Sequence, residues 1–174
     1  GFDMTHPDLA PNYRTNPGEE AGNGIDDDGN GFIDDVSGWD FRGNDANPAA
    51  GFADDHGTAV AGVAAARGNN NLGVTGSCPN CTIIPIRLGN TVATQANGFA
   101  YAQQMGADII TNSWGYTIGT PATVVVVNAI NNAANNGRGG LGSVVLFAMN
   151  NPNVNDCGAT PDISSINNVI AVSR

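Results

Sequence analysis

The sequence contains no lysine. Its six basic residues are all arginines, set against sixteen aspartates and glutamates, and the formal net charge is −10. Nucleic acids and anionic membrane surfaces are bound by clusters of basic residues, which this chain does not offer. The sequence also lacks any run of the roughly 18–20 apolar residues that a membrane-spanning helix needs. We therefore expect neither nucleic acid nor a membrane as a partner.

The length and composition are those of a folded domain. With 174 residues and a hydrophobic fraction of 41%, the chain can bury a sizeable core, and wholesale disorder is not expected. The chain opens at Gly1 without methionine, ends within the apolar run "NNVIAVSR", and shows no signal peptide. We therefore expect an internal piece of a longer protein, truncated at both ends, in which a missing targeting segment carries little information.

Cysteine is scarce, and two of the three cysteines, Cys78 and Cys81, form a CxxC pair in "SCPNC". A zinc site needs a second pair or suitably spaced histidines, which the sequence lacks. A redox motif would open a helix after a strand, whereas here a strand follows the pair. A local disulfide is the favoured interpretation, with free thiols or a catalytic role as alternatives, and the state of Cys157 stays open.

What the sequence has in abundance is acid at one end. Thirteen of the sixteen acidic residues lie within 1–55, a segment dense in turn formers. Its centre, "NGIDDDGNGFIDD", places oxygen-bearing groups at alternate positions of an EF-hand-like calcium loop, and Ser37 stands where the bidentate glutamate would be, with Asp35 as its candidate substitute. The candidate ligands are Asp26, Asp28, Asn30, the carbonyl of Phe32, and Asp34. We favour calcium over a solvated acidic loop, because crowded carboxylates repel one another without a cation.

Further along, short apolar strands alternate with helices. We predict helices over 57–67, 93–105 and 121–136, and strands over 82–88, 107–114, 143–149 and 167–173. The strands are continuously apolar, as in parallel sheets covered on both faces. The order predicts an α/β fold, a three-layer sandwich around a mostly parallel central sheet. The segments "RLGN", "NSWG" and "AMNNPN" that follow the strands should converge on the edge where such sheets place their chemistry.

No internal repeat or second domain is visible in the sequence. We interpret residues 1–174 as one partial catalytic domain, with an acidic loop-rich region over 1–55 and an α/β core over 56–174. The run "GRGGLG", 137–142, matches a dinucleotide-binding pattern, but it follows a helix and precedes a strand instead of the reverse. We therefore interpret it as a helix-ending turn.

One of the two histidines lies in an unusual context. His56 follows two aspartates in "DDHGTAVAGVAAA", at the start of a helix made of small residues. Small residues let a helix lie close against a sheet, and an imidazole held by such a helix is suited to general-base catalysis. An ordinary surface or capping histidine is the simpler interpretation of the residue taken alone.

Five segments, taken in order, carry a family resemblance. "HGTAVAGVAAA" is similar to the catalytic-histidine segment of the subtilisin-like serine proteases, the subtilases, and "GFDMTHPDL" to the stretch after the family's catalytic aspartate. "NNNLGVTG" resembles its calcium loop, "ADIITNSWG" its substrate-binding strand, and "VVLFAMNN" the strand that ends in the oxyanion-hole asparagine. The resemblance spans essentially the whole chain and implies the subtilisin-like fold. It also implies a secreted, monomeric serine endopeptidase acting on proteins or peptides.

The resemblance implies roles for residues at matching positions. His56 would be the general base, and Ser113, Trp114 and Gly115 would line the cleft and pair with the substrate backbone. A structural calcium ion would be bound by Asp8, by Asn70 and by the carbonyls of Leu72 and Val74, with the carbonyl of Gly68 as an additional candidate, while His6 would have a structural role only. The oxyanion donor would be Asn151 or, if a family glycine is deleted, Asn150. We favour Asn151, since counting from Phe147 then needs no gap.

Two members of the catalytic triad lie outside this pattern. The family's aspartate directly precedes the residue that matches Gly1, and its nucleophile belongs to a Gly-Thr-Ser segment, which does not occur here. With the histidine alone, we expect the 174-residue chain to be inactive by itself. A non-catalytic calcium-binding module and a pseudoprotease are the alternatives.

The two acids before His56 raise a question of specificity. Asp54 and Asp55 could favour a basic side chain next to the scissile bond, as in some subtilases. Solvated loop acids are the simpler interpretation, because surface acids are common.

Overall fold

The computed structural model describes residues 1–117, 119–149, 151 and 162–173. The chain forms two compact units, which we call unit 1 (Gly1–Gly89) and unit 2 (Asn90–Arg174). The helix at His56 and the strand that follows it, which the sequence grouped with the α/β core, therefore fold with the acidic segment in unit 1.

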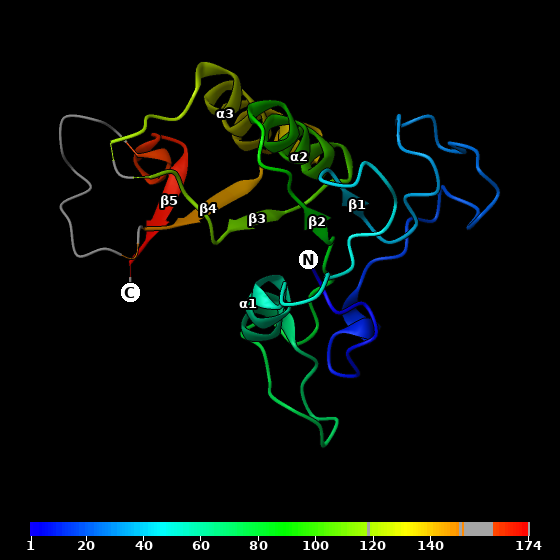
Figure 1. The fold of residues 1–174 in the computed structure, drawn as a ribbon. Helices are drawn as coiled ribbons and strands as arrows, with labels where there is room; N and C mark the ends of the chain where they lie inside the picture. Colours follow the sequence, from blue (N-terminus) through cyan, green and yellow to red (C-terminus); the bar gives the residue numbers. More distant parts are fainter. Residues whose placement is uncertain (118, 150, 152–161, 174) are drawn as a thin grey trace. The chain divides into compact units, whose positions relative to one another are not determined.

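Unit 1 has little regular structure (Figure 1). Its elements are a 3-10 helix η1 (Ala10–Asn12), strand β1 (Trp39–Asp40), helix α1 (His56–Ala65) and strand β2 (Ile86–Arg87). β1 and β2 pair in parallel, with Asp40 opposite Arg87. An isolated parallel bridge joins Tyr13 to Ile83, so the predicted strand over 82–88 is present as a bridge and a short strand.

The acidic segment of unit 1 is held by side chains that bond the backbone. The Asp34 carboxylate accepts N–H groups from Gly22, Asn23 and Gly24 at 2.7, 3.1 and 3.1 Å. One oxygen of Glu19 accepts two more N–H groups, those of Asp27 and Asp28. Asp and Asn side chains compete with regular ladders in this way, which explains why this long segment forms turns instead of strands.

Helix α1 consists mostly of Ala, Gly and Val and ends at Ala65, where the chain turns into an extended conformation. The chain after the helix returns to the helix end at Gly76, whose N–H donates to the carbonyl of Ala66 at 3.0 Å. A Cβ at Gly76 would lie 2.5 Å from the Ala66 nitrogen, so only glycine permits this approach. The helix C-terminus is therefore satisfied by a segment of unit 1 itself.

Unit 2 is a parallel sheet covered by two helices. Its elements are α2 (Val92–Gln104), β3 (Ile109–Asn112), α3 (Val124–Gly140), β4 (Val144–Ala148), η2 (Ile163–Ser165) and β5 (Val169–Val172). The strand order is β3-β4-β5, and α2 and α3 pack side by side next to the sheet (Figure 1). This mixed arrangement with parallel strands confirms the predicted α/β class.

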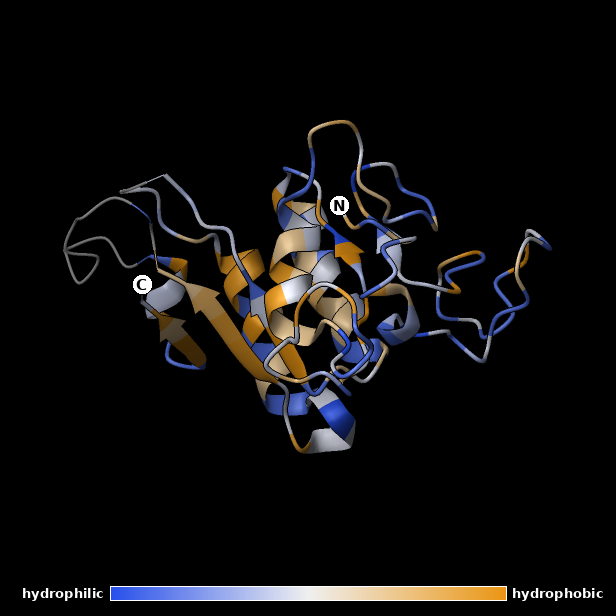
Figure 2. Cartoon of the chain, turned by 90° about the horizontal axis from the view of Figure 1, so that it is seen from below, coloured by the Kyte–Doolittle hydropathy of each residue, from blue (hydrophilic) through white to orange (hydrophobic). Residues whose placement is uncertain are grey.

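The core of unit 2 is apolar, as the orange strands and helix faces in Figure 2 show. Phe99, Val126, Ile130 and Phe147 are almost fully buried. Helix α2 begins at a capping box formed by Thr91 and Thr94, which satisfies free N–H groups of its first turn. The capping box thus marks the start of this helix.

The sequence predicted strands buried on both faces, and the structure differs in this respect. Side chains along β3 alternate between exposed and buried, and Ile109 and Ile170 are more than half exposed. Within the described residues, the strand faces are therefore not equally covered. No helix in the described part of the chain is long and apolar enough to cross a membrane.

The predicted helix-ending turn at "GRGGLG" is confirmed. The backbone leaves the helical conformation at Gly137, and Arg138 and Gly139 both have positive φ. At Gly142, φ is +79° and an added Cβ would lie 2.0 Å from the carbonyl oxygen of Ala134, so this turn requires glycine. The segment is a tight reversal into β4 and not a cradle for phosphates.

Candidate functional site

His56 is the first residue of α1, and it is exposed. The helix fixes its backbone, while Asp55 is the N-cap residue and makes no side-chain capping bond. The preceding segment includes Ala53, whose φ of 60° is uncommon for a residue with a Cβ. The imidazole is therefore presented at the end of a regular element, directly after a constrained turn.

Asp54, two residues before His56, is engaged by an arginine. The Arg87 guanidinium donates from Nη1 to Asp40 at 2.7 Å and from Nε to Asp54 at 3.2 Å. Asp40 is buried, and its hydrogen bond to Arg87, opposed by partial burial, raises the pKa of the guanidinium. The strand register, which places Asp40 opposite Arg87, accounts for this pairing. Asp54 is thus a partner of Arg87, whereas Asp55 is exposed.

In unit 2, the predicted cleft residues Ser113, Trp114 and Gly115 follow directly on β3. Trp114 donates its indole N–H to the Oδ1 of Asn112 at 3.1 Å and packs edge-on against Phe147, with ring centroids 5.1 Å apart. The amide of Asn112 is buried and donates to the carbonyl of Leu146 on β4 at 3.1 Å. Sequence reasoning missed Asn112, whose polar side chain at the end of an apolar strand was the available signal.

The candidate oxyanion residues follow β4. Asn150 lies outside the described residues, and Asn151 is exposed. Because β3 and β4 are parallel neighbours, with Asn112 opposite Phe147, the segments after both strands begin at the same edge of the sheet. The sheet thus brings the Ser113 segment and the Asn151 segment to one edge of unit 2, while His56 belongs to unit 1.

Asp8 is the centre of the candidate calcium loop in unit 1. Its carboxylate is buried and accepts the Asn70 amide at 2.7 Å and the N–H of Val74 at 2.9 Å. These bonds, the Asn70 one first, lower the pKa of Asp8. Asn70 also accepts the N–H of Leu72 at 3.2 Å, and His6 accepts the N–H of Asp8 through Nδ1 at 3.2 Å. The structure therefore brings the residues of this loop together around one carboxylate.

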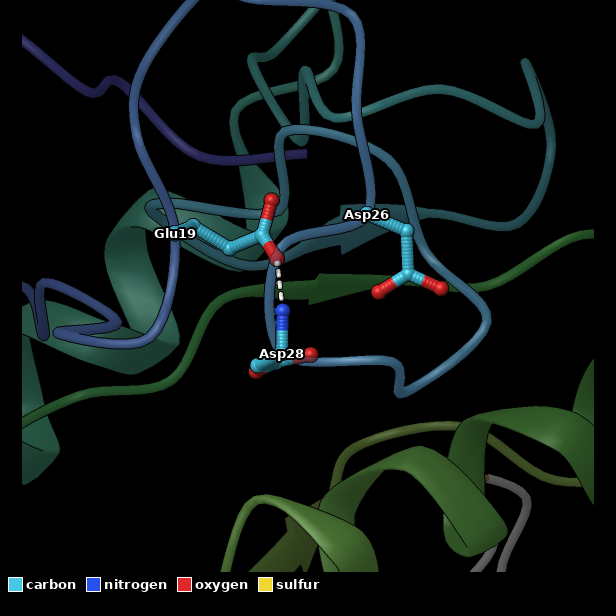
Figure 3. A group of neighbouring side chains, drawn as sticks. All are labelled: Glu19, Asp26 and Asp28. Atoms are coloured by element: carbon cyan, nitrogen blue, oxygen red, sulfur yellow. Dashed lines mark hydrogen bonds between the residues drawn. The ribbon is translucent and has the colours of Figure 1, made fainter.

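A second group of carboxylates lies in the acidic segment. Glu19, Asp26 and Asp28 each offer an oxygen within 4.8 Å of the others (Figure 3). The Oε1 of Glu19 accepts the N–H of Asp28 at 3.1 Å, whereas its Oε2 is buried and has no hydrogen-bond partner among the described residues. Three close carboxylates and an orphaned carboxylate oxygen fit a hard cation such as Ca²⁺.

The other predicted ligands of this loop lie differently. The Asp34 carboxylate accepts N–H groups of the 22–24 turn and is not part of the group of three close carboxylates. The third member of that group, beside Asp26 and Asp28, is Glu19. Asn30 donates its amide to Asp28 and Asp35, and it accepts the N–H of Phe32. Asp35 is fully buried. Sequence spacing could not find Glu19, because the ligand pattern of a continuous loop does not include a residue seven positions earlier.

The CxxC pair is a disulfide, which confirms the favoured interpretation. Cys78 and Cys81 are bonded, with their Cα atoms 5.3 Å apart. The N–H of Cys78 donates to the carbonyl of Ala64 in α1, so the disulfide ring is attached to the helix end. Cys157 lies outside the described residues.

Comparison with known proteins places these features in a family. A profile described as "Subtilase family" matches residues 1–174. The chain is 34% identical over 177 residues to a thermophilic serine proteinase of Bacillus sp. strain AK1, covering 99% of this chain and 35% of that protein. It is 39% identical over 121 residues to thermitase of Thermoactinomyces vulgaris, covering 67% of this chain and 40% of the relative.

A calcium-dependent protease of Trichormus variabilis is 40% identical over 121 residues, covering 61% of this chain and 18% of the relative. A crystal structure of MycP1 with its N-terminal propeptide removed superposes with a TM-score of 0.48 at 26% identity, over 63% of this chain and 35% of the other. The chain thus spans well under half the length of these relatives. The profile match over all 174 residues shows that the chain belongs to the subtilase family.

Proposed function

We propose that this protein contributes to peptide-bond hydrolysis as part of a serine endopeptidase, with His56 as the general base. The observation that carries the proposal is the position of His56, exposed at the first turn of α1 in a chain of the subtilase family. In this role the imidazole takes the proton of a serine hydroxyl and gives it to the leaving amine.

Two segments of unit 2 would act on the substrate. The residues 113–115 extend β3 and offer backbone groups to an extended peptide, in the manner of an added strand. Asn151 would donate its amide to the oxyanion that develops in the transition state, and losing such a donor typically costs about 10²–10³ in rate. Both segments begin at the same sheet edge, which supports a joint role.

The nucleophile and the orienting aspartate are proposed to come from segments other than those described. None of the serines of this sequence stands in a Gly-Thr-Ser or G-x-S-x-G context. A histidine without its serine and aspartate retains little catalysis. We also propose that the enzyme is secreted, since a disulfide such as Cys78–Cys81 persists in oxidising compartments.

The activity is tested on the natural polypeptide that contains this sequence, by labelling with a fluorophosphonate and by hydrolysis of casein. Labelling and hydrolysis are expected, and His56→Ala should abolish both, whereas His6→Ala should leave turnover largely intact. The 174-residue chain alone should do neither. Absence of labelling in the natural polypeptide would favour a pseudoprotease or a calcium-binding module and overturn the proposal.

We further propose that the protein binds structural Ca²⁺ at two places. The first is the loop around Asp8, with Asn70 and the carbonyls of Leu72 and Val74. The second is the group of Glu19, Asp26 and Asp28, with its orphaned Glu19 oxygen. The calcium-dependent relative supports this proposal, as do the oxygen-only donor sets.

Calcium removal separates this proposal from a merely acidic surface. At free calcium about 100-fold above its Kd, one site adds about 2.7 kcal/mol to the free energy of unfolding. EGTA should therefore lower the melting temperature of the chain. Glu19→Gln should reduce the gain from calcium, while the neighbouring Glu20→Gln, whose side chain is exposed, should not. Equal melting temperatures with calcium and EGTA would contradict the proposal.

A further inference from the structure

One polar side chain in the core of unit 2 is not explained by the packing of the sheet. Asn112 is the last residue of β3, lies on the face of the strand that also buries Ile110, and is only 6% exposed. A buried amide is costly unless its donors and its acceptor are bonded. A leucine would fill a similar volume without that requirement, so the amide is accounted for by the groups that it joins.

The Asn112 amide joins three segments of the chain. Its Nδ2 donates to the carbonyl of Ile110 at 3.3 Å and to that of Leu146, on β4, at 3.1 Å. Its Oδ1 accepts the indole N–H of Trp114 at 3.1 Å. The side chain therefore links β3 to β4, and it links both strands to the segment that follows β3.

Trp114 is held from several directions. Besides its bond to Asn112, its ring packs edge-on against Phe147 of β4 at a centroid distance of 5.1 Å and against Tyr116 at 5.9 Å. The hydroxyl of Tyr116 in turn donates to the Oε1 of Gln95 on α2 at 2.6 Å. The indole is thus fixed both to the sheet and to a helix of unit 2, and it holds the backbone of its own residue with them.

This anchoring matters because β3 is at the edge of the described sheet of unit 2. The strand order is β3-β4-β5, so within that sheet β4 is the only strand that pairs with β3. The backbone of residues 113–115, which we proposed to pair with a substrate peptide, continues from this edge strand. Main-chain hydrogen bonds to an added strand give more affinity when the backbone that makes them is already ordered.

We propose that Asn112 is a positioning residue for the substrate: through the indole of Trp114 it holds the backbone of residues 113–115 for pairing with an extended peptide. Asn112 itself is buried and would not contact the substrate. The inference rests on the proposed function, because it assigns a task at that same site. It predicts that loss of the Asn112 amide affects long substrates more than short ones.

The test uses the natural polypeptide that contains this sequence, with Asn112→Leu. Two p-nitrophenyl esters are compared: one carries the four residues that precede a bond cleaved in casein, and the other carries only the last of them. Active sites are counted by titration with a fluorophosphonate, so that kcat/KM refers to folded, reactive enzyme alone. Asn112→Leu should lower kcat/KM about tenfold for the longer ester and less than about twofold for the shorter one, because the longer ester pairs with more of the segment.

A second variant asks whether Asn112 acts through Trp114. Trp114→Phe keeps a ring and removes the N–H that Asn112 accepts. Because Trp114 is also proposed to line the cleft, its replacement has an effect of its own, and the combination with Asn112→Leu is the informative measurement. If both residues act through one shared bond, the double variant should lose less kcat/KM for the longer ester than the product of the two single losses.

Asn132→Leu is the matched control. Asn132 lies on α3 and also donates its amide to another element, to Gln103 of α2 at 2.7 Å, but it is exposed and belongs to neither proposed substrate segment. Asn132→Leu should leave kcat/KM unchanged for both esters. A loss confined to Asn112→Leu then reflects this particular amide and not the removal of any asparagine from unit 2.

Two results would overturn the inference and leave the proposed function intact: equal losses for the two esters in Asn112→Leu, or single losses that multiply in the double variant. Absence of fluorophosphonate labelling in the unaltered polypeptide would overturn the proposed function and this inference with it. If Asn112→Leu does not fold, Trp114→Phe alone breaks the same bond, and an equal effect on both esters would then contradict the inference. Its control is Trp39→Phe, because the indole N–H of Trp39 has no acceptor among the described residues.

Discussion

The two units of this chain are stabilised in different ways. In unit 1, carboxylates and amides bond the backbone of long turns, and buried polar residues such as Asp8, Asp35 and Asp40 are part of the interior. In unit 2, aromatic and aliphatic side chains such as Phe147 pack between helices and a parallel sheet. The difference shows how a single chain can combine a half with a largely polar interior and a half with a hydrophobic core.

The physical basis of the difference is the distribution of charge. Thirteen of the sixteen acidic residues lie within residues 1–55. Unit 1 therefore has many hydrogen-bond acceptors and carboxylates that repel one another, and backbone N–H groups and Arg87 offset this repulsion. Unit 2 has few charges and is stabilised chiefly by burial of apolar surface. Four predictions test this comparison.

The largest effect is expected in the core of unit 2. Phe147 is fully buried and contacts the rings of Phe99 and Trp114. Phe147→Ala should lower the free energy of unfolding by about 3–5 kcal/mol, from lost transfer energy and the cavity left behind. Urea unfolding measures the change. Val144→Ala on the same strand is the control and should cost far less, because Val144 is partly exposed.

The second prediction concerns the polar interior of unit 1. Asp35 accepts the side-chain amides of Asn16 and Asn30, both at about 3 Å. Asp35→Ala should lower the free energy of unfolding by about 2–3 kcal/mol, because two amides lose a charged acceptor. The exposed Glu20→Ala should be nearly neutral in the same urea experiment. Equal costs for the two variants would show that unit 1 is not stabilised by its polar interior.

The third prediction compares the ion pair of Arg87 and Asp40 in unit 1 with that of Arg138 and Asp108 in unit 2. Arg87→Met should cost about 1–2 kcal/mol, because the buried Asp40 loses its guanidinium. Arg87→Lys should recover part of the loss, since an ammonium can contact one carboxylate but does not span two as a guanidinium does. In unit 2, Asp108→Ala should cost less than about 0.5 kcal/mol, as expected for an exposed pair with Arg138. Thermal unfolding in low and high salt distinguishes them.

The last effect is absent at neutral pH and appears only at alkaline pH. Burial, and then the charge of Asp3, raise the pKa of Tyr13 to about 12. Burial alone raises the pKa of Tyr116 in unit 2. A raised folded pKa means that stability is intact below pH 10 and falls between pH 10 and 12, because the unfolded chain loses its proton first. Absorbance at 295 nm should show Tyr13 ionising late, with Tyr13→Phe assigning the transition. Ionisation near pH 10 would contradict this account.

The sequence predicted the elements of unit 2 well, because the spacing of apolar residues along the chain agrees there with the side chains that the fold buries. Strands β3, β4 and β5 lie within the predicted ranges, helix α2 is offset from its predicted range by one residue, and helix α3 overlaps its own. In unit 1 the apolar pattern is sparse, and side-chain hydrogen bonds between distant residues decide the conformation. The predicted strand over 82–88 is accordingly reduced to a bridge at Ile83 and the two residues of β2.

The candidate site was predicted in the same uneven way. The position of His56 at the start of a helix was readable from the sequence, because small residues and a helical period follow it. The carboxylate group was only half readable: Asp26 and Asp28 were found, while Glu19 was not. The pairing of Asp54 with Arg87 was not readable at all, since the two residues are 33 positions apart.

The sequence alone determined the α/β class, the local disulfide, the helix-ending glycine turn and the family, because each depends on residue type and spacing along the chain. Only the tertiary structure decided which carboxylates lie together, that Asp54 and not Asp55 pairs with Arg87, and that the indole N–H of Trp39 has no acceptor among the described residues. These depend on contacts between segments far apart in the chain, where strand register and turn geometry, and not local propensity, set the distances.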